Sequence, residues 1–154
     1  MLKIKIIFVC LGNYCRSPMA EAIFKELARS ENILDHFDVT SKGTKNWDIG
    51  LRPDPRTQRI LKKHNYPLDE TKRAEKITPQ EIQTADYLIA MSERVANELQ
   101  SPENAQLLMS YVADAPSLDI PDPYPTDTFP EAFKMIEKGV NAFYKAIKQA
   151  YSLK

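Results

Sequence analysis

Residues 4–18 of this chain read IKIIFVCLGNYCRSP, and this stretch decides the fold. Its first half is apolar and rich in β-branched side chains, which is typical of a buried strand over residues 3–10. Its second half ends at Ser17-Pro18, a pair that favours the N-cap and first turn of a helix. Cys10 is therefore expected at the carboxyl end of a strand, with Arg16 six residues later where a helix begins.

The loop between that strand and that helix is expected to bind an anion. Such a loop directs successive backbone N–H groups inward, and the helix dipole adds positive potential. Positive surroundings favour the thiolate form of Cys10, which can attack phosphorus in line and form a thiophosphate ester. Ser17 is expected to donate a hydrogen bond to that sulfur, and Asn13 to brace the loop through its side-chain amide. Arg16 offers a planar fork for two phosphoryl oxygens, so we predict a phosphate-binding set of Leu11, Gly12, Asn13, Tyr14, Cys15 and Arg16.

Composition limits the class of protein. The chain has 154 residues, 43% hydrophobic and 27% charged, with a net formal charge of zero. This suits a single globular domain over residues 1–154, with no global field that would attract nucleic acid or a membrane surface. No apolar run reaches the length of a membrane span, and no cleavage-like site follows residues 4–9. We therefore expect a cytoplasmic protein, with leaderless export left open.

The few cysteines and histidines exclude other kinds of chemistry. Cys10 and Cys15, five residues apart, fit reactive thiols in a reducing compartment better than a disulfide framework. His36 and His64 are far apart in sequence and lack zinc-ligand spacing, so we predict no metal site.

The rest of the chain alternates predicted strands and helices. Strands are expected at residues 3–10, 37–41, 87–91 and 106–111. Helices are expected at Pro18–Ser30, from Pro55 to about His64, behind a capping box at Thr78–Glu81, through residues 95–99, and from about Thr128 to Tyr151. The proline- and aspartate-rich residues 114–127 fit neither pattern and predict a long loop. This alternation predicts an α/β fold, a doubly wound, Rossmann-like parallel sheet with helices on both faces, whose ligand lies at the carboxyl ends of the strands.

The motif also resembles that of a known family, the low-molecular-weight protein tyrosine phosphatases. Val9 to Glu21 match the family's N-terminal motif almost throughout. The likeness continues through Trp47-Asp48-Ile49-Gly50, Asp54-Pro55-Arg56, Lys63-His64, residues 86–91 and Pro121-Asp122-Pro123-Tyr124. The resemblance implies a four-stranded parallel sheet flanked by helices and hydrolysis of phosphotyrosine in proteins, without metal or cofactor. On this basis we assign a role in supporting the loop to Asn13, Ser17 and His64.

A departing phenolate needs a proton, so a carboxylic acid must face the loop from elsewhere in the chain. Chemistry alone does not choose among the four aspartates of the long loop, which are Asp114, Asp119, Asp122 and Asp127. The resemblance selects Asp122, because these enzymes keep the general acid in an Asp-Pro-Tyr sequence. Pro121 and Pro123 would stiffen its placement, and after phosphoryl transfer Asp122 would act as the base that activates water.

Three aromatic residues are candidates for the walls of a slot that grips the substrate ring. Tyr14, Trp47 and Tyr124 would make a deep slot, which favours phosphotyrosine over the shorter phosphoserine. Tyr14 departs from the aliphatic residue or threonine usual in the family, and its effect on substrate choice stays open. The resemblance also suggests that Cys15 forms a reversible disulfide with Cys10, which would protect the nucleophile from over-oxidation.

Three rival functions use the same features. Thiol-dependent arsenate reductases relay oxidation through further cysteines in the middle of the chain, and residues 16–154 contain none. A protein-arginine phosphatase is favoured by a threonine where Tyr14 stands. A phosphoryl-binding module without turnover would not need Cys10 or Asp122. The expected partners are phosphotyrosine-containing proteins, and the expected state is a monomer, with weak self-association through Trp47 and Tyr124 left open.

Overall fold

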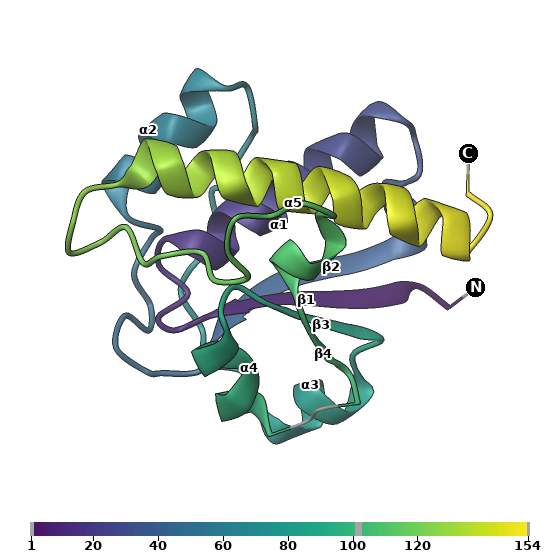
Figure 1. Ribbon diagram of the computed structural model, residues 1–154, viewed down its shortest axis with the longest axis horizontal. Coiled ribbons are helices and arrows are strands. Elements are labelled where there is room, and N and C mark those ends of the chain that lie inside the picture. The colour runs from purple at the N-terminus through teal and green to yellow at the C-terminus, as the bar shows by residue number, and fades with distance from the viewer. Residues whose placement is uncertain (1, 101–102, 154) are drawn as a thin grey trace.

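The sheet determines how the molecule is organised. A computed structural model describes residues 2–100 and 103–153 (Figure 1). Four parallel strands form one sheet in the order β2-β1-β3-β4. The strands are β1 (Ile4–Cys10), β2 (Phe37–Gly43), β3 (Tyr87–Ala90) and β4 (Ala105–Leu107). The predicted four-stranded α/β fold is thus confirmed, and β1 is a central strand, paired with β2 as far as Cys10 and Gly43.

Helices cover both faces of this sheet (Figure 1). On one face lie α1 (Arg16–Ser30), α2 (Pro55–Lys63) and α5 (Phe129–Ala150), and on the other α3 (Pro79–Thr84) and α4 (Glu93–Leu99). Alternation along β1 explains the two layers, because successive side chains point to opposite faces. Ile6 and Phe8 join the cluster under α1 and α5, whereas Ile7 and Val9 join the cluster under α3 and α4. A strand buried on both faces reads as a continuous apolar run, as residues 4–9 do.

Two predicted boundaries were wrong. The first helix begins at Arg16 instead of Pro18, and Ser17 is not its N-cap, because the Ser17 hydroxyl is used by other partners within the loop. The fourth strand ends at Leu107, and the rest of the predicted strand is a 3-10 helix, η2 (Leu108–Tyr111). Leu108 turns there to pack on α5, where a β-carbon at Gly139 would lie 2.7 Å from the Leu108 Cγ atom.

Other local signals were read correctly. Asp54 caps α2 by accepting the Arg56 N–H, and Thr78 and Glu81 form a reciprocal capping box at α3. A short 3-10 helix, η1 (Leu34–His36), was not predicted. Within residues 2–100 and 103–153, no helix has both the length and the apolar composition needed to cross a bilayer.

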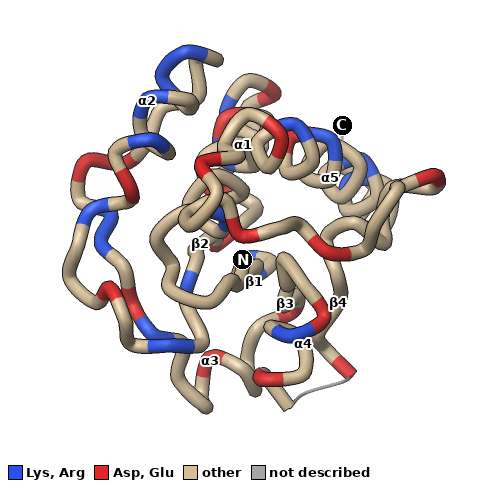
Figure 2. Tube along the Cα trace, turned by 60° about the vertical axis from the view of Figure 1, so that its left-hand side comes forward, with Lys and Arg blue, Asp and Glu red and all other residues tan. Residues whose placement is uncertain are grey.

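The carboxyl ends of the strands lie toward the left in Figure 1, the side that is turned forward in Figure 2. The loop after β1, the long connection between β2 and α2, and the loop before α5 all meet there. Parallel strands end at the same edge of a sheet, so three segments far apart in the sequence become neighbours.

Candidate active site

A cavity of about 320 Å³ lies where these three segments meet. Its lining residues are Cys10, Leu11, Gly12, Tyr14, Cys15, Arg16, Trp47, Asp48, Asp122 and Tyr124. The structure therefore brings together every residue predicted to be catalytic and every predicted wall residue. Asp48 is an addition, and burial raises its pKa, with the nearby charge of Asp122 acting in the same direction.

The floor of the cavity is the end of β1. Cys10 is buried, and its Sγ lies 3.0 Å from the Ser17 Oγ atom. Arg16, the first residue of α1, is also buried, and its Nη1 donates to the Ile120 carbonyl oxygen at 2.8 Å. Ile120 is two residues before Asp122, so this bond fastens the aspartate-bearing loop to the start of α1, next to the loop that follows β1.

Asn13 holds the loop in shape. Its φ of 55° lies in the left-handed region, which asparagine tolerates better than most residues. Its Nδ2 donates to Ser17 Oγ at 2.8 Å and to Ser41 Oγ at 3.0 Å, while its Oδ1 accepts the Glu75 N–H at 3.0 Å. Because Ser17 accepts from Asn13, its own hydroxyl proton is available to the Cys10 sulfur. This arrangement orients Ser17 as a donor, which stabilises a thiolate.

A buried ion pair fixes the far end of this chain of hydrogen bonds. The Ser41 hydroxyl donates to Glu21 Oε1 at 2.6 Å, and an ionised carboxylate only accepts, so Ser41 must accept from Asn13. Lys72 Nζ donates to the Ser41 carbonyl at 2.8 Å and lies 3.5 Å from Glu21 Oε1. The side chains of Lys72 and Glu21 are only 8% and 7% exposed. Burial lowers the pKa of Lys72, against the charge of Glu21, which acts to raise it.

Glu21, Ser41 and Lys72 were not predicted from the sequence as a group. A glutamate on the apolar face of α1 and a serine inside a buried strand are signals that something polar must face them. Nothing in the sequence indicated that Lys72, between two exposed residues, would be the cation.

The four aspartates of the long loop have different surroundings. Only Asp122 lines the cavity, where its Oδ1 accepts the Tyr124 N–H at 3.1 Å. Asp119 accepts the Glu93 N–H at the start of α4 at 2.8 Å. Asp127 pairs with Arg56 at 3.1 Å, and Asp114 approaches Lys138 at 3.8 Å. The other three therefore have partners elsewhere, and of the four only Asp122 lines the same cavity as Cys10.

Aromatic rings form the mouth of the cavity. Tyr14 and Tyr124 lie with their ring centroids 6.1 Å apart, and the Arg56 guanidinium lies 5.3 Å from the Tyr124 ring centroid. Trp47 and Tyr124 are 59% and 56% exposed, which is unusual for large aromatic side chains unless they face a ligand or partner.

Cys15 lies beside the nucleophile but in a different environment. It is buried, and its Sγ is 4.0 Å from Asp54 Oδ2. Burial raises the pKa of the Cys15 thiol far above its usual range, and the charge of Asp54 raises it further. This raised pKa favours the thiol form of Cys15 at neutral pH, and a thiol is a poor nucleophile.

Two glycines allow close contacts around the loop. A β-carbon at Gly43, the last residue of β2, would lie 2.6 Å from the Leu11 carbonyl oxygen and 3.0 Å from the Asn13 nitrogen. A β-carbon at Gly12 would lie 2.5 Å from Asp48 Oδ2. The end of β2 thus rests directly against the phosphate-binding loop.

His64 does not take the supporting position that the sequence analysis assigned to it. It caps the carboxyl end of α2, and its ring stacks on Phe133 of α5 with 4.4 Å between centroids. The direction of α2 carries this end away from the loop. The Asn13 side-chain oxygen is satisfied by the Glu75 N–H instead.

A parallel sheet with Cys10 at the end of β1 and Arg16 at the start of α1 is the arrangement expected of a phosphatase of α/β fold. The sequence model of the family described as low molecular weight phosphotyrosine protein phosphatase matches residues 5–153. The chain belongs to this family and is a protein-tyrosine phosphatase, a hydrolase.

Individual relatives agree. The low molecular weight protein-tyrosine-phosphatase YfkJ of Bacillus subtilis is 35% identical, with 97% of this chain and 99% of the relative covered. Its crystal structure has a TM-score of 0.93, covering 97% of this chain and 98% of that one. The human low molecular weight phosphotyrosine protein phosphatase is 38% identical over 77% of this chain and 78% of its own. A Drosophila arginine phosphatase is 35% identical, with a TM-score of 0.85 and coverage of 94% and 98%.

Proposed function

We propose that Cys10 is the nucleophile, Arg16 the phosphoryl-binding cation and Asp122 the general acid in hydrolysis of phosphotyrosine in proteins. The observation that carries this assignment is the presence of all three in one cavity, at the end of a strand and the start of a helix. The backbone N–H groups of residues 11–16 and the Arg16 guanidinium stabilise the charge on the transferring phosphoryl group.

The reaction proceeds in two steps on these residues. Cys10 attacks phosphorus, a sulfur–phosphorus bond forms, and the bond to the phenolic oxygen breaks while Asp122 gives that oxygen its proton. Asp122 then takes a proton from water, which attacks the phosphocysteine and releases phosphate. Ser17, oriented as a donor by Asn13, stabilises the sulfur both as attacking thiolate and as leaving group. Cys10 must be ionised while Asp122 is protonated, so the rate of the first step has a bell-shaped pH dependence.

Phosphotyrosine is favoured over phosphoarginine by the mouth of the cavity. The relative with arginine phosphatase activity makes phosphoarginine the second candidate. Tyr14, paired with Tyr124, and the exposed Trp47 offer aromatic surfaces that suit a phenyl ring. Arsenate reduction is not supported, because the chain has no cysteine beyond Cys10 and Cys15 to relay oxidation.

Steady-state turnover of phosphotyrosine, phosphoarginine and arsenate by wild type and Cys10→Ser tests the substrate. We expect phosphotyrosine to be hydrolysed with the highest kcat/KM and Cys10→Ser to be inactive. Higher kcat/KM for phosphoarginine would overturn the choice of substrate but leave the nucleophile in place. For the acid, Asp122→Ala should lower kcat by about a hundredfold or more. Asp119→Ala is the matched control, and a larger loss there would refute the assignment of Asp122.

We also propose that the protein acts as a monomer in the cytoplasm. Cys10 and Cys15 are both free thiols, which suits a reducing compartment. In a monomer, the exposed aromatic residues at the cavity mouth stay accessible to the substrate. Elution at the monomer volume across a range of protein concentrations, with an unchanged profile for Trp47→Ala, is the expected result.

A further inference from the structure

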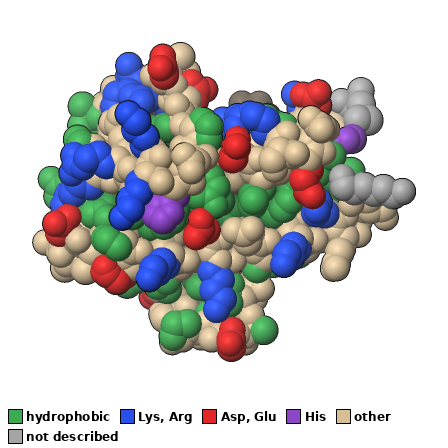
Figure 3. Space-filling model, turned by 90° about the horizontal axis from the view of Figure 1, so that it is seen from above, with side chains coloured by type: hydrophobic (Ala, Val, Ile, Leu, Met, Phe, Trp, Pro, Cys, Tyr) green, Lys and Arg blue, Asp and Glu red, His purple; other side chains and the backbone are tan. Residues whose placement is uncertain are grey.

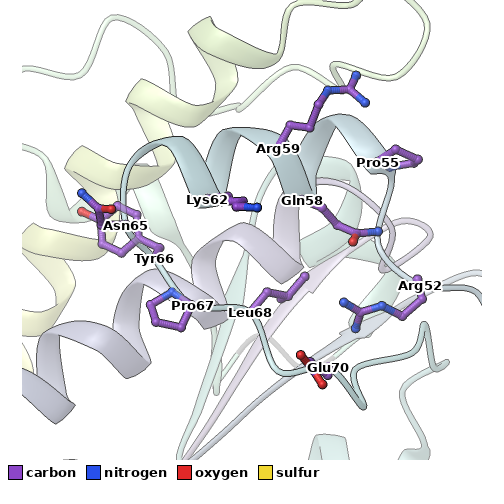
Figure 4. A pocket seen from close by; sticks show the side chains of 10 residues that line it. All are labelled: Arg52, Pro55, Gln58, Arg59, Lys62, Asn65, Tyr66, Pro67, Leu68 and Glu70. Carbon is purple, nitrogen blue, oxygen red and sulfur yellow. The ribbon is translucent and has the colours of Figure 1, made fainter.

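A second hollow lies outside the site described above. It has a volume of about 790 Å³ and lies between α2 and the segment of residues 66–70 (Figure 4). Pro67 and Leu68 form part of an apolar side, and basic side chains project from α2 and from the chain before it. We call this hollow the α2 groove.

The α2 groove is basic in a chain whose net formal charge is zero. Arg52, Arg59 and Lys62 line it, against one carboxylate, Glu70. Among residues 2–100 and 103–153, none of these three cations has an ion-pair partner within 4.0 Å. Figure 3 shows Lys and Arg side chains gathered toward the left-hand end of the molecule, where α2 lies in Figure 1. Local charge of this kind attracts anionic ligands even when the whole molecule is neutral.

One cation is held in place and two are free to move. Arg52 donates to the Asp69 carbonyl at 2.8 Å and the Lys72 carbonyl at 3.1 Å, so its guanidinium is fixed beside the groove. Arg59 and Lys62 are exposed on α2; Figure 4 shows the Arg59 side chain pointing away from Leu68, so it must rotate to pair with a ligand in the groove. A fixed cation with mobile ones beside it suits a flexible anionic chain.

The α2 groove is linked to the catalytic cavity through the start of α2, although the two hollows have no lining residue in common. Arg52 and Pro55 line the groove, and the residues between and after them contact the cavity's aromatic mouth. The Asp54 N–H donates to the Tyr14 carbonyl at 2.9 Å, and the Arg56 guanidinium lies against the Tyr124 ring. Residues 52–56 therefore contribute to the groove and also contact residues at the mouth of the cavity.

We propose that the α2 groove binds an acidic segment of the phosphoprotein substrate, adjacent in sequence to the phosphotyrosine. This inference rests on the proposed function, and it names a substrate class for the same site. Glutamate or aspartate side chains of that segment pair with Arg59 and Lys62, and its aliphatic parts lie on Pro67 and Leu68. Such pairs are exposed to solvent, so each contributes little and salt weakens them. Nucleic acid fits less well, since α2 has only nine residues, about 13 Å of basic surface, and Glu70 opposes it.

The test compares three phosphotyrosine peptides of equal length, one neutral, one with glutamates before the phosphotyrosine and one with glutamates after it. The variant is the double substitution Arg59→Glu/Lys62→Glu. Its matched control is Lys134→Glu/Lys145→Glu, two exposed lysines of α5 with the same change of charge. p-Nitrophenyl phosphate, which has no flanking segment, reports whether each variant keeps an intact catalytic site.

We expect wild type to favour one acidic peptide over the neutral peptide by about tenfold in kcat/KM, equivalent to about 1.4 kcal/mol. The α2 variant should lose that preference through KM, with kcat and turnover of p-nitrophenyl phosphate unchanged, and the α5 control should keep it. In about 0.5 M salt the preference of wild type should fall below about twofold.

Other results overturn the proposal. Equal kcat/KM for all three peptides in wild type, or an equal loss in the α5 control, would refute the groove as a binding site. Stronger inhibition by an RNA oligonucleotide than by the unphosphorylated acidic peptide would assign the groove to nucleic acid. If wild type hydrolyses neither the neutral peptide nor p-nitrophenyl phosphate, the proposed function itself fails, which is distinguishable from failure of the groove.

Discussion

Replacing Glu21 by glutamine removes the carboxylate that ends the hydrogen-bond chain behind the nucleophile. In the wild-type protein this carboxylate accepts from Ser41 at 2.6 Å and lies 3.5 Å from the buried Lys72 ammonium group. Lys72 forms no other ion pair within the part of the chain that the structure describes. Removing one partner of a buried pair costs about 3–5 kcal/mol, because the other charge stays buried without compensation. We expect the lower end, about 3 kcal/mol, since burial already lowers the pKa of Lys72 and makes loss of its proton easier.

Thermal unfolding measures this cost. For a chain of this size, 1 kcal/mol corresponds to about 2–4 °C, so Glu21→Gln should lower Tm by about 6–12 °C. Glu26→Gln is the matched control, since Glu26 is on the same helix and forms only an exposed pair with Arg29. The double variant Glu21→Gln/Lys72→Met should recover most of the loss, because it removes both charges. A Tm for Glu21→Gln equal to that of Glu26→Gln, or no recovery in the double variant, would refute this account of the pair.

The same substitution should also change catalysis. A glutamine amide can donate to Ser41 and compete with Asn13 Nδ2 for its hydroxyl oxygen, which would loosen the Asn13 amide that orients Ser17 as a donor. The acidic limb of the pH profile of kcat/KM should then move to higher pH, measured well below the Tm of the variant. An unchanged pH profile would show that the pair stabilises the fold without orienting Ser17.

Three further predictions follow from the site and the core. Ser17→Ala removes the hydroxyl group that lies 3.0 Å from the Cys10 sulfur. A hydrogen bond to a charged group contributes about 1.5 kcal/mol or more, so kcat/KM should fall at least about tenfold. An unaltered acidic limb of the pH–rate profile would contradict the role of Ser17 in stabilising the thiolate. Burial and Asp54 raise the pKa of the Cys15 thiol, so iodoacetate at neutral pH should alkylate Cys10 alone, as detected by mass spectrometry. Cys15→Ser should stay active, but after peroxide treatment a thiol reductant should restore less of its activity than in wild type. Full recovery in this variant would count against the protective disulfide. Burial and carboxylate acceptors raise the pKa of Tyr66 and Tyr144, so the stability they contribute is present below the ordinary tyrosine pKa of about 10 and is lost as pH rises above it. Tm should therefore fall through this range, and less steeply in Tyr66→Phe/Tyr144→Phe than in wild type.

The parts of the fold and site that the sequence predicted are those set by neighbouring residues. The apolar run of β1, the caps at Asp54 and Thr78, and the loop from Cys10 to Arg16 all depend on short-range geometry. The fourth strand was overextended, because a short apolar run fits a strand as well as a buried 3-10 helix. Only packing of Leu108 against Gly139 of α5 distinguishes them.

The parts that could not be predicted depend on partners far apart in the chain. Residue chemistry alone left four aspartates as candidates for the acid and only the resemblance selected Asp122, because the partners of Asp119 and Asp127 lie far away in the sequence. The buried pair of Glu21 and Lys72 joins α1 to a loop that had no recognisable pattern. The role of His64 in supporting the loop came from the resemblance alone, which gave no sign that its ring would stack on Phe133 of α5.

The contact of Gly43 with the phosphate-binding loop has a consequence for how this sequence can change over generations. Every single-nucleotide missense change of a glycine codon introduces a β-carbon, and at this position the nearest backbone atoms lie 2.6 Å and 3.0 Å away. No residue that one nucleotide change can place at position 43 therefore fits without a shift of the loop backbone, although Gly43 takes no part in the chemistry. The exposed aromatic residues at the mouth can be replaced one at a time without such a clash, and the substrate preference can change with them. The backbone of the loop is constrained by its contact with Gly43 and cannot change by single substitutions at that position.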